Sequence, residues 1–194
     1  MGFFDWSAPL FGHFADRWSE ADRARIASRL RPHVPEGGRI ADIGGGTGAL
    51  AVHLADALGA AVIVVDPTPR MLRYVPERPD VVPLLGTAEE LPFENASFDA
   101  VVVSDAFHHF RDQDRAVREF QRVLRPGGAV LLLEWDASGF FGPVLVTGER
   151  LLGEPGAFFS PEQLCAFMAG HELPGHCEKT HGISYYFLGY ARQR

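Results

Sequence analysis

The stretch Arg39-Ile-Ala-Asp-Ile-Gly-Gly-Gly-Thr-Gly48 decides the fold that this sequence predicts. It starts as a short apolar run interrupted by Asp42 and then becomes a glycine-rich loop. Residues typical of the buried face of a helix come next: Leu50, Ala51, Leu54, Ala55 and Leu58. Glycine lets the backbone turn sharply and approach a ligand closely, because it has no β-carbon. We therefore expect a strand–loop–helix unit that binds a cofactor.

Later apolar runs have the length and composition of strands: 61–65, 81–85, 98–103 and 129–133. Pro83 suggests that one of them lies at a sheet edge, since proline cannot donate a ladder hydrogen bond. Residues 173–191 are typical of two more strands that turn near His181-Gly182. Because helix signals separate the runs, the sequence predicts an α/β fold, a Rossmann-like doubly wound sheet that is mostly parallel with helices on both faces.

Capping signals mark where the helices should begin. The expected starts are Ser19-Glu-Ala-Asp22, Thr68-Pro69, Asp112 and Ser160-Pro-Glu-Gln163. The first helix would bury Ile26, Ala27 and Leu30. The helix capped by Asp112 should end at Arg125-Pro-Gly-Gly128, and its apolar stripe would be Ala116, Val117, Phe120, Val123 and Leu124.

Length and composition fit one globular domain. The chain has 194 residues, of which 46% are hydrophobic and 22% charged, enough for one well-buried core. We expect a single domain over 1–194. Its expected parts are an N-terminal aromatic segment and helix (1–35), a cofactor-binding core (36–134), a substrate cap (135–160) and a C-terminal helix with a β-hairpin (161–194).

Composition also disfavours several classes of protein. No apolar stretch approaches the ~20 residues that span a bilayer, and the N-terminus lacks a secretory pattern, so we expect no membrane span and a cytoplasmic protein. A formal net charge of −7 disfavours nucleic acid as a partner. Cys165 and Cys177 belong to neither a C-x-x-C pair nor a His/Cys cluster, so we expect reduced thiols and no metal site.

The glycine loop by itself is compatible with two cofactors. Gly44, Gly46 and Ala49 satisfy the dinucleotide pattern G-x-G-x-x-G/A, and Asp66 lies near the spacing of a ribose-binding acid, as in nicotinamide-dependent oxidoreductases. Asp42 favours the other cofactor. A carboxylate there would repel a pyrophosphate but attract the ammonium group of S-adenosylmethionine, unless it only holds the amides of the loop.

Three strand ends lie where a site for S-adenosylmethionine needs polar groups. Asp66 ends the second strand, where its two oxygens can accept hydrogen bonds from both ribose hydroxyls. The turn that follows the third strand contains Thr87 and Glu89, whose side chains can bind an adenine edge. Ser104-Asp-Ala-Phe-His-His109 follows the fourth strand, beside the expected switch point where such sheets bind ligands.

In their order, these motifs resemble those of the class I S-adenosylmethionine-dependent methyltransferases, most closely the small-molecule branch with the ubiquinone/menaquinone biosynthesis C-methyltransferases. The motifs lie between Gly37 and Glu134: Asp42-Ile-Gly-Gly-Gly-Thr-Gly48, Asp66, Gly86-Thr-Ala-Glu-Glu-Leu-Pro-Phe93, Phe98-Asp-Ala-Val-Val-Val103 and Leu124-Arg-Pro-Gly-Gly128. The resemblance implies about seven strands with an antiparallel last strand, S-adenosylmethionine as cofactor, S-adenosylhomocysteine as product and a small-molecule methyl acceptor.

The resemblance also implies roles for residues at matching positions. The glycines of the loop would line the methionine and ribose, Pro67 and Met71 the adenine face, and Ala88 with its neighbours the adenine edge. With Asp42 and Ser104, the expected cofactor site is Asp42, Gly44, Gly45, Gly46, Asp66, Pro67, Met71, Thr87, Ala88, Glu89 and Ser104. Two positions depart from the family pattern. Thr87 stands where Asp or Asn is usual, and Phe14 stands where a Tyr-Asp pair is frequent.

His108 is the candidate catalytic residue. Methyl transfer from a sulfonium needs mainly orientation, and it needs a base where the acceptor is protonated. His108 and His109 lie beside the expected site, and histidine exchanges protons near neutral pH. Alternatively, one histidine packs under the sheet and the other hydrogen-bonds locally. Glu134, at the end of the fifth strand, either reaches the site or is a satisfied strand terminus.

Two further questions stay open at the level of sequence. The first question concerns the aromatic residues of segment 1–18 and Phe140, Phe141, Phe158 and Phe159. They either cover an apolar or aromatic methyl acceptor or belong to the core. A nicotinamide-dependent oxidoreductase and a methyltransferase-like module that binds without catalysis are the alternatives to a methyltransferase.

Overall fold

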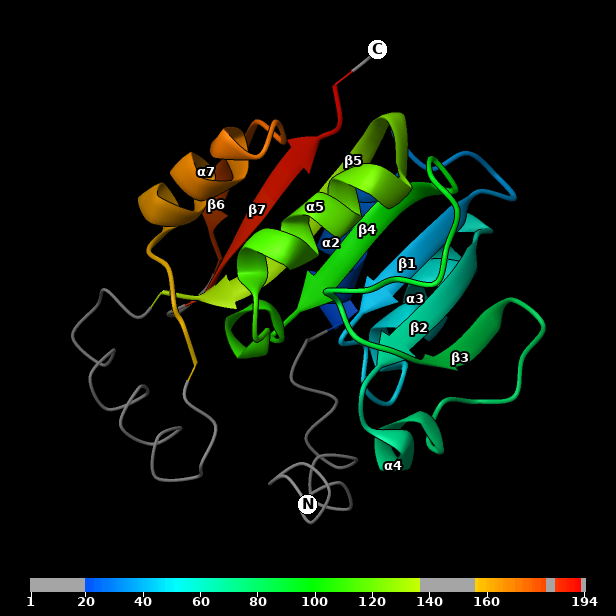
Figure 1. Ribbon diagram of the computed structural model, residues 1–194. Coiled ribbons are helices and arrows are strands. Elements are labelled where there is room, and N and C mark those ends of the chain that lie inside the picture. The colour runs from blue at the N-terminus through cyan, green and yellow to red at the C-terminus, as the bar shows by residue number, and fades with distance from the viewer. Residues whose placement is uncertain (1–19, 137–155, 181–183, 193–194) are drawn as a thin grey trace.

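Seven strands form one mixed sheet in the described parts of this computed structural model, which are residues 20–136, 156–180 and 184–192 (Figure 1). The strands are β1 (Arg39–Ile43), β2 (Ala61–Asp66), β3 (Val81–Leu85), β4 (Phe98–Ser104), β5 (Leu124–Trp135), β6 (Gly175–Lys179) and β7 (Ser184–Tyr190). Their order across the sheet is β3-β2-β1-β4-β5-β7-β6. Strands β1 to β5 pair in parallel, and β7 runs antiparallel to both of its neighbours. The predicted doubly wound sheet with an antiparallel last strand is confirmed.

The order of the strands creates a switch point between β1 and β4. From β1 the chain moves outward to β2 and β3, and it then returns to place β4 on the other side of β1. Connections on the two sides leave in opposite directions, so the carboxyl ends of β1 and β4 open a crevice where such sheets bind ligands. Pro83 lies in β3, which pairs only with β2. The predicted edge position of that strand is therefore confirmed.

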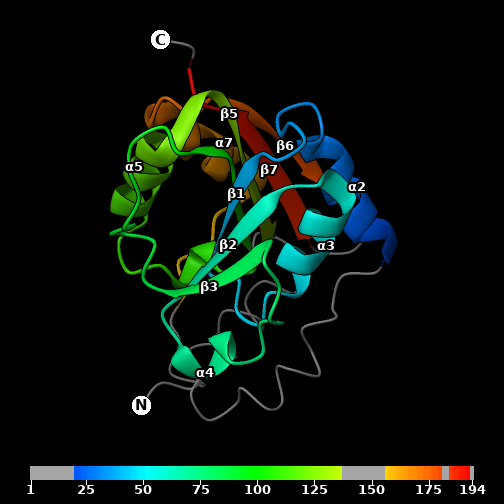
Figure 2. The same ribbon diagram turned by 90° about the vertical axis from the view of Figure 1, so that its right-hand side faces the viewer.

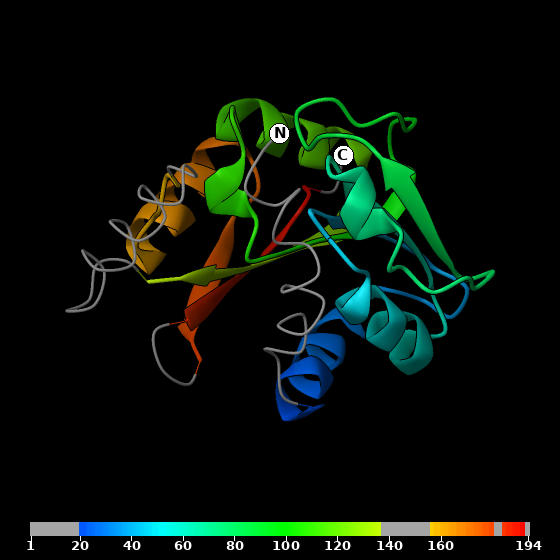
Figure 3. The ribbon, with the colours of Figure 1, turned by 90° about the horizontal axis from the view of Figure 1, so that it is seen from below.

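Helices cover both faces of the sheet (Figures 2 and 3). They are α2 (Glu20–Leu30), α3 (Ala49–Leu58), α4 (Pro69–Leu72), the 3-10 turn η1 (Phe107–His109), α5 (Gln113–Val123) and α7 (Pro161–Gly170). One apolar core joins α2 and α3 to the sheet, and a second joins η1, α5 and α7 to the opposite face. The face predicted for 49–58 is buried as expected.

The helix starts predicted at Thr68-Pro69, Asp112 and Ser160 are confirmed. The carboxylate of Asp112 accepts a hydrogen bond from the Arg115 amide at 2.8 Å, and Ser160 and Gln163 form a complete capping box. Thr68 differs, because it stands at the N-cap of α4 without a capping hydrogen bond and its side chain bonds to Asp66 instead. Ser19 and the turn at 181–182 lie outside the described residues, and so do segments 1–18 and 137–155.

The end of α5 also differs from the prediction. The helix stops at Val123, and Leu124, which was expected in its apolar stripe, already begins β5. Arg125 precedes a proline, and a residue in that position disfavours helical backbone angles. Residues 125–128 bulge out of the ladder, since Phe98 pairs with Leu124 but Ala100 pairs with Ala129.

Within the ranges that the structure describes, no helix is both long and apolar enough to cross a membrane.

Replacing Asp112 with alanine should lower the free energy of unfolding by about 1 kcal/mol, because the Arg115 amide then loses its acceptor at the start of α5. Asparagine at the same position keeps an acceptor oxygen and should retain most of the stability. Urea unfolding of the three proteins at neutral pH measures the difference. A loss with asparagine as large as that with alanine would contradict the capping role.

Candidate cofactor site

The glycine loop joins β1 to α3 and lies against the turn that follows β4. Gly44 has a φ of 72°, in the left-handed region that favours glycine. A β-carbon on Gly44 would lie 2.5 Å from that of Ala106, so no larger residue fits between the loop and this turn. The close approach brings the ends of β1 and β4 together at the switch point. Ser104, the last residue of β4, lies at the same end of the sheet.

Asp66 ties the loop to the end of β2. Its side chain is buried, one carboxylate oxygen accepts a hydrogen bond from the Gly46 amide at 3.0 Å, and the other accepts from the Thr68 amide at 2.8 Å. Burial raises the pKa of Asp66, and the hydrogen bonds from Thr68 and Gly46 oppose that rise. A carboxylate has about four acceptor positions, and the Thr68 side chain also bonds to Asp66, so the group retains capacity for a further donor such as a ribose hydroxyl.

Asp42 lies directly beneath the loop and is fully buried. Neither of its carboxylate oxygens has a hydrogen-bond partner among the described residues, so there the acid does not hold the amides of the loop. A β-carbon on Gly45 would lie 2.6 Å from one of these oxygens. Burial and then the negative charge of Asp66 raise the pKa of Asp42 to about 7. A nearby cation strongly stabilises the ionised form of a carboxylate that is buried without a hydrogen-bond partner.

The residues expected around adenine come from two neighbouring turns. Met71, in α4, reaches toward the loop, since its methyl carbon would lie 3.2 Å from a β-carbon on Gly46. Pro67 is exposed beside Asp66, Thr87 is exposed after β3, and Ala88 is buried. Glu89 is turned toward the next loop, where one of its oxygens accepts hydrogen bonds from the Arg111 and Asp112 amides at 2.9 and 3.4 Å. Its contact to the backbone of 111–112 was not foreseen.

His108 and Glu134 form a buried pair on the other side of the switch point. Nδ1 of His108 lies 2.6 Å from one carboxylate oxygen of Glu134. The other oxygen accepts a hydrogen bond from the Phe107 amide at 2.9 Å. Both side chains are only about 5% exposed or less. A carboxylate oxygen without a proton only accepts, so this contact favours the His108 tautomer that carries its proton on Nδ1.

The sequence identifies His108 and Glu134 as candidate residues but does not predict the contact between them. The signal that could have done so is their position, because His108 follows β4 and Glu134 ends β5, and these two strands are parallel neighbours. The carboxyl ends of parallel neighbours meet at one edge of a sheet.

Aromatic side chains surround this pair. The ring of Phe158 stacks on that of His108 with 4.5 Å between centroids and an interplanar angle of 18°, and the Ala157 amide donates to the His108 carbonyl at 2.9 Å. Phe159 and Phe167 continue the aromatic cluster on the face of Phe107. Phe140 and Phe141 lie outside the described residues. The described part of the predicted cap thus supplies one wall beside His108.

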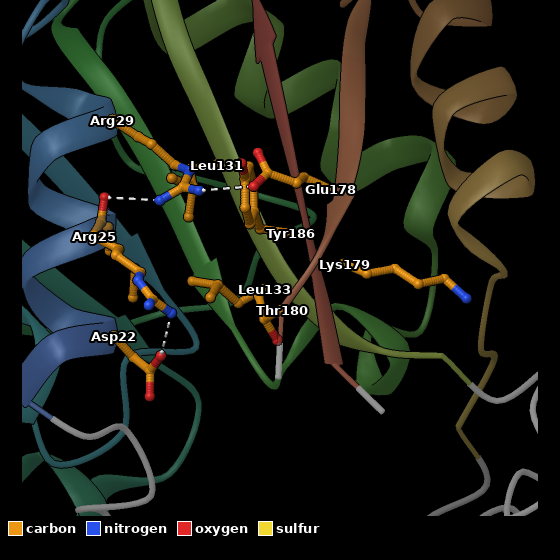
Figure 4. Close-up of a pocket in the computed structure, with 10 residues that line it drawn as sticks. Asp22, Arg25, Arg29, Leu131, Leu133, Glu178, Lys179, Thr180 and Tyr186 are labelled. Carbon is orange, nitrogen blue, oxygen red and sulfur yellow. Dashed lines mark hydrogen bonds and ion pairs between the residues drawn. The ribbon is translucent and has the colours of Figure 1, made fainter. Parts of the chain in front are cut away.

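The cavity shown in Figure 4 lies elsewhere, between α2 and the strands β5 to β7. It has a volume of about 90 Å³. Each arginine at its rim already has an acidic neighbour: Arg25 lies 3.6 Å from Asp22, and Arg29 lies 3.3 Å from Glu178. The paired charges offer no evident site for an ionic ligand. Over the described ranges of the chain, no group of three or more His, Cys, Asp or Glu side chains is arranged to hold a metal ion.

A family model described as a methyltransferase domain matches residues 41–132. The chain is 46% identical over 99 residues to an uncharacterized methyltransferase of Mycobacterium tuberculosis, which covers 50% of this chain and 40% of that protein. It is 34% identical over 163 residues to a demethylmenaquinone methyltransferase of Deinococcus radiodurans, which covers 75% of this chain and 67% of that protein. The chain therefore spans less than half the length of the mycobacterial relative but two thirds of the second.

Solved structures share the fold at low identity. A S-adenosylmethionine-dependent methyltransferase of Thermotoga maritima, described as a possible histamine N-methyltransferase, superposes with a TM-score of 0.77 at 23% identity over 98% of both chains. A chain from a complex of the Haloferax volcanii Trm112 methyltransferase activator and a putative methyltransferase gives a TM-score of 0.84 at 19% identity, again over 98% of both chains. With its ordered motifs, its fold and these relatives, the chain belongs to the class I S-adenosylmethionine-dependent methyltransferases.

Proposed function

We propose that this chain transfers the methyl group of S-adenosylmethionine to a small apolar or aromatic acceptor and releases S-adenosylhomocysteine. The observation that carries the proposal is the buried carboxylate of Asp42 beneath the glycine loop, which has no hydrogen-bond partner among the described residues and lies near Asp66. A cationic ammonium group stabilises such a site, whereas a pyrophosphate would place further negative charge beside two acids. The site therefore favours S-adenosylmethionine over a nicotinamide dinucleotide.

The residues of the site fit the parts of this cofactor. Asp42 would attract the ammonium group, Gly44 to Gly46 would line the methionine and ribose, and Asp66 would accept hydrogen bonds from the ribose hydroxyls. Adenine would lie between Pro67 with Met71 and the turn of Thr87, Ala88 and Glu89, and Ser104 would complete the polar lining. When bound, S-adenosylmethionine supplies a methyl group on a sulfonium that needs no further activation.

His108 would act as the base in this proposal, and Glu134 would position it. A phenol or quinol becomes a stronger nucleophile when it loses its hydroxyl proton, and Nε2 of the neutral imidazole can accept that proton. Glu134 fixes the ring through Nδ1 and favours the imidazolium that results. The relatives named demethylmenaquinone methyltransferase and ubiquinone/menaquinone biosynthesis C-methyltransferase support an aromatic acceptor of the reduced-quinone kind.

The remaining parts of the chain would serve the same reaction. We propose one domain over residues 1–194, with a cap at 135–160 whose aromatic side chains exclude water from the acceptor. The ring of Phe158 against His108 supports this role for the cap. A module that binds the cofactor without catalysis is the alternative, and the experiments below separate the two.

Isothermal titration calorimetry should show that the protein binds S-adenosylhomocysteine and does not bind NADH. Asp66→Ala should weaken the binding of S-adenosylhomocysteine by about 1.5–3 kcal/mol, because hydrogen bonds to a charged group are lost. Asp80→Ala is the control, since this exposed acid precedes β3 and pairs with Arg78. Binding of NADH in place of S-adenosylhomocysteine would overturn the proposal, and an unchanged affinity in Asp66→Ala would overturn the ribose assignment.

The affinity for S-adenosylhomocysteine should rise as the pH increases from about 5.5 to 7.5, by at most about tenfold per pH unit. In the free protein the pKa of Asp42 is raised to about 7, and a bound ammonium group would lower it again, so binding releases a proton below that pH. Asp42→Asn removes the titrating group and should flatten the profile. A profile equally steep in Asp42→Asn would assign the pH dependence to another group.

The same shift affects the stability of the free protein. The pKa of Asp42 in the folded protein, about 7, lies above its ordinary value of 3.8, so the folded state binds more protons than the unfolded state between these two pH values. The stability contributed by Asp42 is therefore present at low pH and is lost as the pH rises toward 7. The unfolding free energy of wild type should therefore fall relative to that of Asp42→Asn as the pH rises from 3.8 to about 7, as measured by urea unfolding across this range.

His108→Gln should lower kcat by about 10²–10⁴-fold, the range for loss of a general base, while the affinity for S-adenosylhomocysteine stays within a few-fold of wild type. Glu134→Gln keeps an acceptor for the Phe107 amide and should lower kcat less, with KM for S-adenosylmethionine unchanged. The assay is release of S-adenosylhomocysteine with 1,4-naphthohydroquinone and a panel of phenols.

A matched control exists in the same domain. His171 is a part-buried histidine that lies 3.0 Å from Asp114, and His171→Gln should leave kcat unchanged. Wild-type turnover in His108→Gln would refute the base assignment. Tight cofactor binding without turnover of any acceptor would favour the binding module.

A further inference from the structure

Cys165 and Cys177 lie in contact, a pair that no cysteine pattern in the sequence predicts. Cys165 is in α7 and Cys177 is in the middle of β6, and their sulfur atoms are 2.6 Å apart. Both are free thiols and partly buried. Cys177 is the one residue of β6 that is not exposed, so it is the point where this strand faces the helix. Figure 1 shows α7 lying alongside β6.

The hydrogen bonds give the two thiols different roles. Cys177 donates to the Pro161 carbonyl at 3.0 Å, while Cys165 donates to the Cys177 sulfur. Burial, followed by the Cys165 neighbour, raises the pKa of the Cys177 thiol. Cys177 therefore holds its proton at neutral pH, and its thiol reacts more slowly with an oxidant than an ordinary cysteine does.

We propose that Cys165 and Cys177 are a reversible dithiol–disulfide site that joins α7 to β6. With hydrogen peroxide as oxidant, the Cys165 sulfur attacks one peroxide oxygen, the O–O bond breaks, and a sulfenic acid and one water form. The Cys177 sulfur then attacks the Cys165 sulfur, the S–S bond forms, and the S–O bond breaks to release a second water. Two thiols are oxidised to one disulfide while one peroxide is reduced to two waters. A dithiol such as dithiothreitol reverses the step by exchange.

The position of this bond determines its effect. β6 is the outermost strand and pairs only with β7, so its contact with α7 is its other main support. Residues 165 and 177 are close in sequence, and a disulfide between them closes a short loop that contains the connection from α7 to β6. The thiols are already in contact in the folded chain, so the main effect of the bond is to restrict the unfolded chain.

The same helix leads to the aromatic wall beside His108. α7 begins directly after Phe158 and Phe159, and the Tyr185 hydroxyl of β7 donates to the Phe159 carbonyl at 3.0 Å. The disulfide would thus tie α7, the helix that follows this wall, to β6. This structural inference does not depend on the proposed methyl transfer, and its test uses no activity assay.

The test starts from the full chain, fully reduced and then treated with a small excess of hydrogen peroxide. The chain contains two cysteines, so an internal disulfide can only join Cys165 to Cys177. We expect both thiols to become unreactive toward a thiol reagent in denaturant, the intact mass to fall by two hydrogen atoms, and the product to run as a monomer on a non-reducing gel. The thermal midpoint should rise by about 5–10 °C and return after dithiothreitol.

Cys165→Ser and Cys177→Ser are the matched controls, because each keeps one thiol and cannot form the internal bond. Neither should show the peroxide-dependent rise in thermal midpoint. Two reactive thiols remaining in oxidised wild type, covalent dimers as the main product, or an oxidised monomer that melts below the reduced protein would each overturn the proposal. Thiol counting in wild type needs no variant and decides the question even where a serine variant folds poorly.

Discussion

The burial of two carboxylates at the ends of β1 and β2 is the constraint on which the site depends. Asp66 compensates for its burial by accepting two backbone amides, one of which belongs to the glycine loop. Asp42 accepts no such hydrogen bond from the described residues, and the negative charge of Asp66 further disfavours its ionised form. A fold that only needed stability would place apolar residues there, since an unpaired buried acid costs free energy. This cost supports our proposal that a positively charged group of the cofactor binds beside Asp42.

The glycine loop is the steric complement of these acids. The tight distances from Gly44 to Ala106 and from Gly45 to Asp42 leave no space for a β-carbon at either position. The loop therefore packs between the acid below it and the turn after β4 beside it. Since the same turn continues into His108, a single packing arrangement sets both the binding loop and the histidine that we assign as base. The site is held by strand ends rather than by long loops, which favours a fixed geometry.

Much of the fold followed from the sequence because it depends on local patterns. Apolar runs located the parallel strands, Pro83 identified an edge, and the periodicity of 49–58 selected the buried face of α3. The end of α5 was missed by one residue. The apolar stripe continues through Leu124, but this residue is already extended, two residues before Pro126. The candidate site followed in part, through the acids and glycines. Three contacts depend on which helices, strands and turns meet in the folded chain: Glu134 with His108, Glu89 with the 111–112 backbone, and Cys165 with Cys177. No local pattern in a single sequence encodes such contacts.

The place of β7 has a consequence for how the sheet is completed. This strand lies between β5 and β6 although it follows both in the chain, so β6 has no neighbouring strand until residues 184–190 insert. During synthesis, the outer half of the sheet must therefore wait, with the edge of β5 open, for a segment that the ribosome makes after β6. Until then α7 is the partner on which β6 can dock. Assembly of this edge is thus an insertion step rather than the simple addition of one strand after another.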